Sequence, residues 1–170
     1  MRLGVFVFCV LGMLVASAPV MAQAQPSEVR TIRGTGQPIP RFVTLKADEV
    51  NMRAGPGLHF PIQFVYRHAG YPMKVIGEFD AWREVIDHQG DRGWMHASVL
   101  SFKRSAAVMH DNALIYKAAS LSSPPLAQAE AEAVLDVLGC QPIWCRVGGA
   151  RIRGWIPKNQ LWGVLADEEF

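Results

Sequence analysis

The sequence has no marked excess of charge of either sign. Its 17 Lys and Arg stand against 15 Asp and Glu, which gives a formal net charge of +2 over 170 residues. Because domains that bind nucleic acid usually present a basic face, this balance argues against DNA or RNA as a partner.

Motifs of catalytic and metal sites are missing as well. The chain has no Gly-x-Ser-x-Gly elbow and no Ser-x-x-Lys pair, the signatures of two classes of serine enzyme. Its histidines form no His-x-x-x-His pair and have no Cys or carboxylate at a recognised ligand spacing; they are His59, His68, His88, His96 and His110. We therefore predict a protein without catalytic residues, metal or cofactor.

Charge is absent from Leu3–Val15, which follows Met1-Arg2 and precedes a stretch of small residues. A short positive start, a short apolar run and a small-residue zone are typical of a secretory signal. We expect cleavage after Ala22, with Ala24 as the other candidate, so that residues 1–22 form the signal peptide. The apolar run is too short to cross about 30 Å of hydrocarbon as a helix. We therefore expect no stable membrane anchor after cleavage, and a periplasmic or secreted protein.

The two ends of the exported part look unfolded. Residues 23–40 are rich in Gln, Pro, Gly and Thr and have almost no apolar clustering, which is typical of a flexible spacer. Residues 166–170 contain Asp167-Glu168-Glu169, and we interpret them as a solvated acidic tail.

One short cassette occurs twice between these ends. Trp82-Arg83-Glu84-Val85, followed by Gly93-Trp94-Met95 and Leu100, reappears as Trp144-Cys145-Arg146-Val147, followed by Gly154-Trp155-Ile156 and Leu161. In both copies Trp-x-x-Val precedes Gly-Trp-aliphatic by a similar gap, and a Leu comes six positions after the second Trp. Duplication of this kind predicts two similar folded units.

Short apolar runs alternate with turn signals in each copy. Val50–Met52, Ile62–Tyr66 and Met73–Ile76, for example, are separated by Ala54–Gly57 and by Ala69-Gly70. Short strands between Gly, Pro and Asp turns predict a small all-β barrel or sandwich.

Leu126–Leu138 is ambiguous. The segment is rich in Ala, Glu, Gln and Leu and follows two prolines, which favours a helix. Ala127–Ala133, however, alternates small apolar with polar residues, and its position matches Ile62–Ile76 of the first copy. We predict strands here.

Cys140 and Cys145 are the two cysteines of the exported part, because Cys9 lies in the signal. Disulfides persist outside the cytoplasm. Five extended steps would separate the two Cα atoms by about 17 Å, whereas a bridge needs about 7 Å or less, so we predict a hairpin closed by a disulfide. Closing so small a loop contributes about 2 kcal/mol. Two buried free thiols are the alternative.

These motifs together resemble the bacterial SH3-like domain. In the first copy the resemblance rests on Asn51–Gly57, on Gly70 before Val75-Ile76, and on the Trp and Gly-Trp motifs of the cassette. The second copy keeps the cassette, but its opening Leu114–Ser120 lacks the Asn, Gly and Pro of the first.

The resemblance implies an all-β chain with two tandem small SH3-like half-open β-barrels of five strands, after the signal peptide and the flexible spacer. We place the first barrel at residues 41–103 and the second at 104–165. Relatives of this kind are typically non-catalytic modules that bind cell-wall peptide, glycan or protein partners.

Aromatic side chains are the candidates for a binding groove, because rings offer contact area at low entropic cost. We predict ligand-binding positions at Arg53, Phe60, Tyr66, Trp82, Trp94 and His96 in the first copy, and at Tyr116, Trp144 and Trp155 in the second, with Arg151 or Lys158 nearby. The alternative is that most of these rings lie in the core or between the barrels.

Three functions stay open at this point. The preferred one is a non-catalytic envelope adaptor that recognises a cell-wall (peptidoglycan) or protein ligand through aromatic-lined loops. The second is a structural docking component of the periplasm, which would use an edge strand or the acidic tail. The third is a small cell-wall hydrolase with an unfamiliar site.

Overall fold

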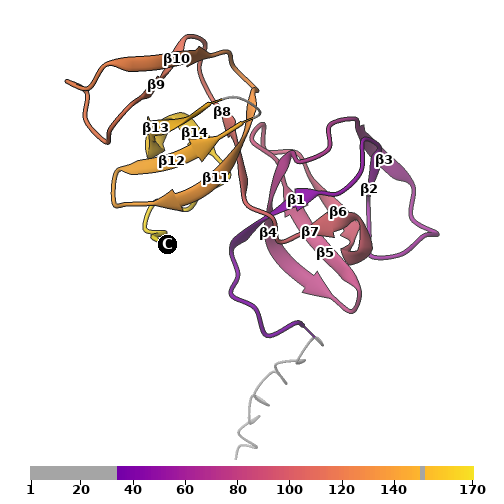
Figure 1. Ribbon diagram of the computed structural model, residues 1–170. Coiled ribbons are helices and arrows are strands. Elements are labelled where there is room, and N and C mark those ends of the chain that lie inside the picture. Colours follow the sequence, from indigo (N-terminus) through magenta and orange to yellow (C-terminus); the bar gives the residue numbers. More distant parts are fainter. Residues whose placement is uncertain (1–33, 150–151) are drawn as a thin grey trace, which may run out of the picture. The chain divides into compact units, whose positions relative to one another are not determined.

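The computed structural model describes residues 34–149 and 152–170 and is built from β-strands (Figure 1). The first unit contains β1 (Arg41–Leu45), β2 (Val50–Arg53), β3 (Ile62–Tyr66), β4 (Pro72–Phe79), β5 (Trp82–Ile86), β6 (Arg92–His96), the 3-10 turn η1 (Ala97–Val99) and β7 (Leu100–Ser101). The second contains β8 (Ser105–Val108), β9 (Ala113–Tyr116), β10 (Pro125–Ala129), β11 (Val134–Cys140), β12 (Trp144–Gly148), β13 (Arg153–Pro157), the 3-10 turn η2 (Lys158–Gln160) and β14 (Leu161–Trp162). The all-β prediction is confirmed.

Both units have the same sheet topology. The strand orders are β3-β2-β6-β5-β4-β1-β7 and β10-β9-β13-β12-β11-β8-β14, so each strand of the first unit has a counterpart seven places later. Each sheet has seven strands rather than the expected five, because β1 and β8 pair with β4 and β11 on one side and with the two-residue strands β7 and β14 on the other. The duplicated cassette therefore does correspond to a duplicated fold.

The predicted strands within Leu126–Leu138 are confirmed. β10 pairs with β9, and β11 pairs with β8 and β12. Between β10 and β11 the chain reverses at Glu132, whose φ of 63° is left-handed. Pairing with neighbouring strands therefore overrides the helix propensity of the alanines, as tertiary context commonly does.

Each core lies on one face of its sheet and follows the alternation of the strands. In the first unit Met52, Met73 and Met95 are wholly buried together with Val75 and Val85. The second unit has a matching cluster around Ile115, Cys145, Val147 and Ile156. The tryptophans of the cassette point to the other face, since Trp94 alternates with buried Gly93 and Met95 along β6. Indoles therefore do not form these cores.

The two cassette glycines permit close approach of neighbouring strands. A Cβ atom on Gly93 would lie 2.8 Å from the main-chain oxygen of Arg53, and one on Gly154 would lie 2.7 Å from that of Tyr116. Only glycine fits at such distances, which explains why both copies have it before the second Trp.

The predicted disulfide is confirmed. Cys140 and Cys145 are directly opposite each other in the β11–β12 hairpin, with their Cα atoms 4.1 Å apart. The hairpin turn is closed by the Gln141 N–H, which donates to the Trp144 oxygen at 2.8 Å.

The first unit has a buried ion pair where the second has the disulfide. Glu78 and Arg83 are directly opposite in the β4–β5 hairpin, in the register that Cys140 and Cys145 have in β11–β12. The Arg83 Nε lies 3.2 Å from the Glu78 carboxylate, which also accepts hydrogen bonds from Arg41 and Thr35. The same register position is therefore stabilised by an ion pair in the first hairpin and by a disulfide in the second.

Two segments expected to be flexible make specific contacts. The signal peptide and residues 23–33 of the spacer lie outside the described residues, but Thr35 donates through its N–H to Glu78 at 2.6 Å. At the other end the interpretation as a solvated tail is wrong for Glu168 and Phe170. The Glu168 carboxylate accepts bonds from Arg104, and Phe170 and Cys140 exchange two main-chain bonds of 3.0 and 3.2 Å. β8 pairs with β11 only from Val134 to Asp136, so the main chain of Cys140 at the end of β11 is free on that side to pair with Phe170.

The fifth tryptophan, which the repeat does not include, joins the two units. Trp162 Nε1 donates to the Pro72 oxygen at 3.2 Å, and its ring meets Phe42 edge-on with centroids 5.2 Å apart. The Lys74 ammonium lies 5.0 Å from the Trp162 ring centroid, a distance typical of cation–π contacts.

Among the described residues, no helix has the length and apolar character that a membrane span requires.

Candidate functional site

Two of the predicted positions in the first unit serve to build a loop. Arg53 Nη1 donates to the main-chain oxygens of Leu58 at 3.2 Å and Phe60 at 2.8 Å. The Phe60 ring fills the space next to Gly55, where a Cβ atom would be only 2.6 Å from it. Arg53 and Phe60 therefore stabilise the 54–61 loop.

The remaining first-unit candidates separate into two places. Trp82 and His96 are cross-strand partners on β5 and β6, with ring centroids 5.3 Å apart, and Trp94 pairs with Glu84 on the same outer face. Tyr66 instead donates its hydroxyl to the buried Asp87 at 2.7 Å. Burial and this bond raise the pKa of Tyr66 above its ordinary value. The Tyr66 hydroxyl therefore has a structural hydrogen-bond partner within the first unit.

In the second unit the three predicted aromatic residues do come together. Tyr116 is the register partner of Trp155, and its ring meets Trp144 edge-on with centroids 5.6 Å apart. Trp144 is buried, whereas Tyr116 and Trp155 are half-buried. The three form one aromatic row across β9, β12 and β13.

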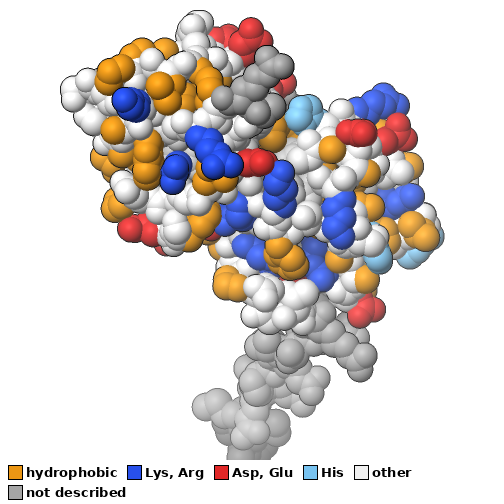
Figure 2. Space-filling model, viewed as in Figure 1, with side chains coloured by type: hydrophobic (Ala, Val, Ile, Leu, Met, Phe, Trp, Pro, Cys, Tyr) orange, Lys and Arg blue, Asp and Glu red, His pale blue; other side chains and the backbone are white. Residues whose placement is uncertain are grey.

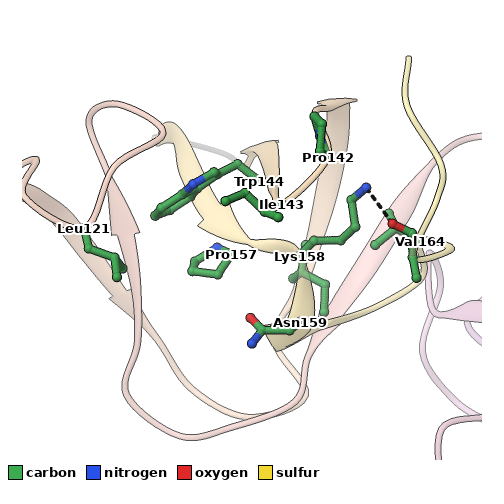
Figure 3. A pocket seen from close by; sticks show the side chains of 10 residues that line it. Leu121, Pro142, Ile143, Trp144, Pro157, Lys158, Asn159 and Val164 are labelled. Atoms are coloured by element: carbon green, nitrogen blue, oxygen red, sulfur yellow. Dashed lines mark hydrogen bonds between the residues drawn. The ribbon is translucent and has the colours of Figure 1, made fainter.

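A pocket lies next to this row and uses Trp144 as a wall. Its volume is about 550 Å³, within the range of small-ligand sites. In Figure 3 the Trp144, Ile143 and Pro157 side chains lie in the middle, with Leu121 on the left and Lys158 and Val164 on the right. The full lining is Leu121, Pro142, Ile143, Trp144, Pro157, Lys158, Asn159, Leu161, Val164 and Ala166. The walls are therefore aliphatic or aromatic except at Lys158 and Asn159.

Lys158 is a buried cation of this pocket. Its side chain runs toward the C-terminal segment (Figure 3), where Nζ donates to the main-chain oxygens of Ala166 at 3.2 Å and Glu168 at 2.8 Å. The Glu168 carboxylate is bound by Arg104, and this bond, with a smaller electrostatic contribution from Lys158, lowers the pKa of Glu168. A positively charged side chain thus lines an otherwise largely apolar pocket.

The local geometry of Lys158 follows from the repeat. The Lys158 N–H donates to the Ile143 oxygen at 2.9 Å, as the Ala97 N–H donates to the Ala81 oxygen at 2.8 Å in the first unit. Positions that carry Ala81 and Ala97 in the first unit thus carry Ile143 and Lys158 in the second. The cavity next to Ala97 in the first unit has a volume of only about 140 Å³ and is lined in part by Arg41 and Arg83.

The sequence identified only part of this site. Trp144 is a predicted ligand-binding position, and Lys158 is one of the two basic residues expected nearby; the other, Arg151, lies outside the described residues. Leu121, Ile143, Pro157 and Val164 were missed, because isolated aliphatic and proline residues in loops carry no motif. Comparing the two copies position by position would have pointed to Ile143 and Lys158, since alanine replaces both in the first unit.

Other surface features give weaker indications of a binding site than this pocket does. On the face seen in Figure 2 acidic and basic side chains both occur, with hydrophobic side chains in patches between them. Within residues 34–149 and 152–170 no three His, Cys, Asp or Glu side chains are grouped so that they would hold a metal ion.

The sequence profile of the bacterial SH3 domain matches the chain twice, at residues 46–101 and at 110–163. The chain belongs to the bacterial SH3 domain family. Each match falls within one of the two seven-stranded units, so the family resemblance and the tandem arrangement are both confirmed. In this protein the second bacterial SH3 domain carries the pocket.

Solved structures similar to this bacterial SH3 protein include NlpC2 and NlpC1 from Trichomonas vaginalis. NlpC2 is 14% identical, with a TM-score of 0.33 and coverage of 72% of this chain and 48% of that one; for NlpC1 the values are 14%, 0.34, 75% and 47%. An NlpC/P60 family protein from Bacillus cereus is 14% identical, with a TM-score of 0.33 and coverage of 71% and 55%. The chain therefore spans about half the length of these proteins. No curated protein matches the chain.

Proposed function

We propose that this protein is an exported, non-catalytic recognition module of the bacterial envelope, and that it binds the peptide part of the cell wall in the pocket of its second bacterial SH3 domain. Membership of the family supports a binding role, because bacterial SH3 domains are often cell-wall binding modules. The observation that carries the proposal is the pocket of about 550 Å³ beside Trp144.

The composition of the pocket favours peptide over glycan. A sugar ring presents hydroxyl groups on its edges, and polar groups that enter an apolar site without partners lose free energy. Asn159 and Lys158 are the polar side chains of the lining, against eight residues with aliphatic, aromatic or proline side chains. Short aliphatic peptide segments fit such walls better.

Co-sedimentation with insoluble peptidoglycan tests the proposal. We expect the mature protein to sediment with the cell wall and Ile143→Asp to bind at least about tenfold more weakly, since one lost apolar contact of this size is worth about 1.5 kcal/mol or more. Ile143 is 71% exposed, so the substitution should not unfold the domain.

A matched control is available in the first domain. Leu58 is 77% exposed and lies in a loop outside the pocket lining, so Leu58→Asp should leave co-sedimentation unchanged. Equal loss in both variants, or no sedimentation of the unaltered protein, would contradict the proposed site. Release of soluble muropeptides by the purified protein would contradict the non-catalytic role.

A docking component of the periplasm is the second candidate function, and β3 favours it. This strand is at the edge of its sheet and exposes Ile62, Phe64 and Val65, and unpaired edge strands are common sites for added strands from partner chains. Loss of a co-purifying envelope protein in Val65→Lys, with cell-wall binding unchanged, would support this role.

A further inference from the structure

We infer that the pocket receives the free carboxyl terminus of a cell-wall stem peptide, and that the Lys158 ammonium pairs with its carboxylate. The inference rests on the proposed function and deepens it, because it states which end of the peptide enters and which group holds it.

The first observation is the incomplete bonding of Lys158. The residue is only 7% exposed, and an ammonium group has three N–H donors. Two of them are used by the main-chain oxygens of Ala166 and Glu168. Among the described residues the third donor has no partner, although the side chain lines a pocket open to a ligand.

The second observation is the lack of a counter-charge in direct contact. A buried cation is stable only when it is well bonded or paired with an anion. The Glu168 carboxylate is the nearest candidate, but both of its oxygens accept from Arg104 and one also accepts from the Leu165 N–H. In the described part of the chain no carboxylate forms an ion pair with Lys158. Arg104 thus takes the Glu168 carboxylate, and an incoming carboxylate would supply Lys158 with a counter-charge.

The third observation is the chemistry of the other walls of the pocket that Lys158 lines. Ile143, Pro157 and Leu121 offer only aliphatic surface to a ligand, and Trp144 adds an aromatic face with one N–H donor (Figure 3). Such walls suit a small aliphatic side chain directly before the carboxylate. A stem peptide that ends in alanine has both features, a methyl side chain and a free carboxylate.

The first domain lacks this arrangement. Ala97 occupies the position of Lys158, and the neighbouring cavity is about a quarter of the size. We therefore expect one carboxylate site per chain.

Isothermal titration of the full mature protein with synthetic peptides tests the inference. The probe is Nα,Nε-diacetyl-Lys-D-Ala-D-Ala with a free carboxylate, compared with the same peptide as its C-terminal amide. We expect the acid to bind at one site per chain and the amide at least about tenfold more weakly, since hydrogen bonds to charged groups usually exceed 1.4 kcal/mol. The L-Ala-L-Ala acid represents a protein carboxyl terminus and should bind more weakly than the D-ended acid.

Charge-removal variants provide the matched control. Lys158→Met should abolish the difference between acid and amide, whereas Lys103→Met, which removes an exposed cation paired with Asp136, should keep it. If Lys158→Met does not fold, the comparison of acid and amide on the unaltered protein still decides.

Three outcomes would overturn the inference. Equal binding of acid and amide would exclude recognition of the carboxylate, and tighter binding of the L-ended acid would exclude the cell wall as its source. If neither acid binds while the protein still sediments with peptidoglycan, the inference fails and the proposed function stands. If the protein binds neither the peptides nor the cell wall, both fail.

Discussion

Replacing Glu78 with Gln should destabilise the first domain by about 3 kcal/mol at pH 7. The carboxylate is buried and is bound by Arg41, Arg83 and Thr35. Burial on its own raises the pKa of Glu78, but the hydrogen bonds from Thr35 and Arg41 outweigh it and lower the pKa from 4.5 to about 2. At any pH above both pKa values, a fall of this size contributes about 3 kcal/mol to the free energy of unfolding. Breaking buried ion pairs in other proteins costs about 3 to 5 kcal/mol.

The pH dependence gives this prediction a second signature. Because the folded-state pKa of Glu78 lies below the unfolded one, its stabilisation is complete above about pH 4.5 and is lost as the pH falls toward 2. The difference in unfolding free energy between the unaltered protein and Glu78→Gln should therefore shrink over this range. Glu168 also has a lowered pKa, but it is present in both proteins and cancels from the difference.

Urea unfolding at a series of pH values is the assay, followed by circular dichroism. Glu49→Gln is the control, because Glu49 pairs with Arg67 in an exposed ion pair that should contribute less than about 1 kcal/mol. A difference for Glu78→Gln that stays the same at pH 7 and pH 2, or that is below about 1 kcal/mol at pH 7, would refute the reasoning.

Three further predictions concern the second domain. Replacing Cys140 and Cys145 with Ser should lower its unfolding free energy by about 2 kcal/mol, and a reductant should have the same effect on the unaltered protein but none on the variant. Gly154→Ala should lower the melting temperature through a cost of about 1 to 3 kcal/mol, because the new Cβ would lie 2.7 Å from a main-chain oxygen of β9; an unchanged melting temperature would contradict the close approach. Glu168→Gln should cost about 1 to 3 kcal/mol by weakening the bond to Arg104. It should also speed hydrogen exchange at the Cys140 amide, which donates to Phe170; unaltered exchange would show that Phe170 stays paired with Cys140 without Glu168.

Local sequence patterns predicted the fold, because the strands and turns that they indicate are the ones that pair in the two sheets. The Gly-Trp pairs marked the strands β6 and β13, and the five-residue spacing of the cysteines marked the hairpin of β11 and β12. The same spacing separates Glu78 from Arg83. Aligning the two copies would have revealed the ion pair that replaces the disulfide, but a glutamate and an arginine five residues apart carry no signal alone.

The candidate site was harder to predict, because its residues meet only through folding. Arg53 and Phe60 have the composition of a binding surface, yet they support a loop. Leu121 and Val164 are 43 residues apart and line the same pocket. The role of Trp162 depends on Phe42, a residue of the other domain. Periodicity within one strand does not report contacts of this kind.

Backbone chemical shifts measured during a titration with soluble muropeptides test the central claim most directly, because they report every residue of both domains at once. We predict that the largest changes fall on Pro142–Trp144, Pro157–Leu161 and Val164–Ala166 of the second domain, with proline positions observed through their neighbours. Changes confined to the Trp82 and Trp94 face of the first domain, or no changes in either domain, would contradict the claim that this pocket is the recognition site.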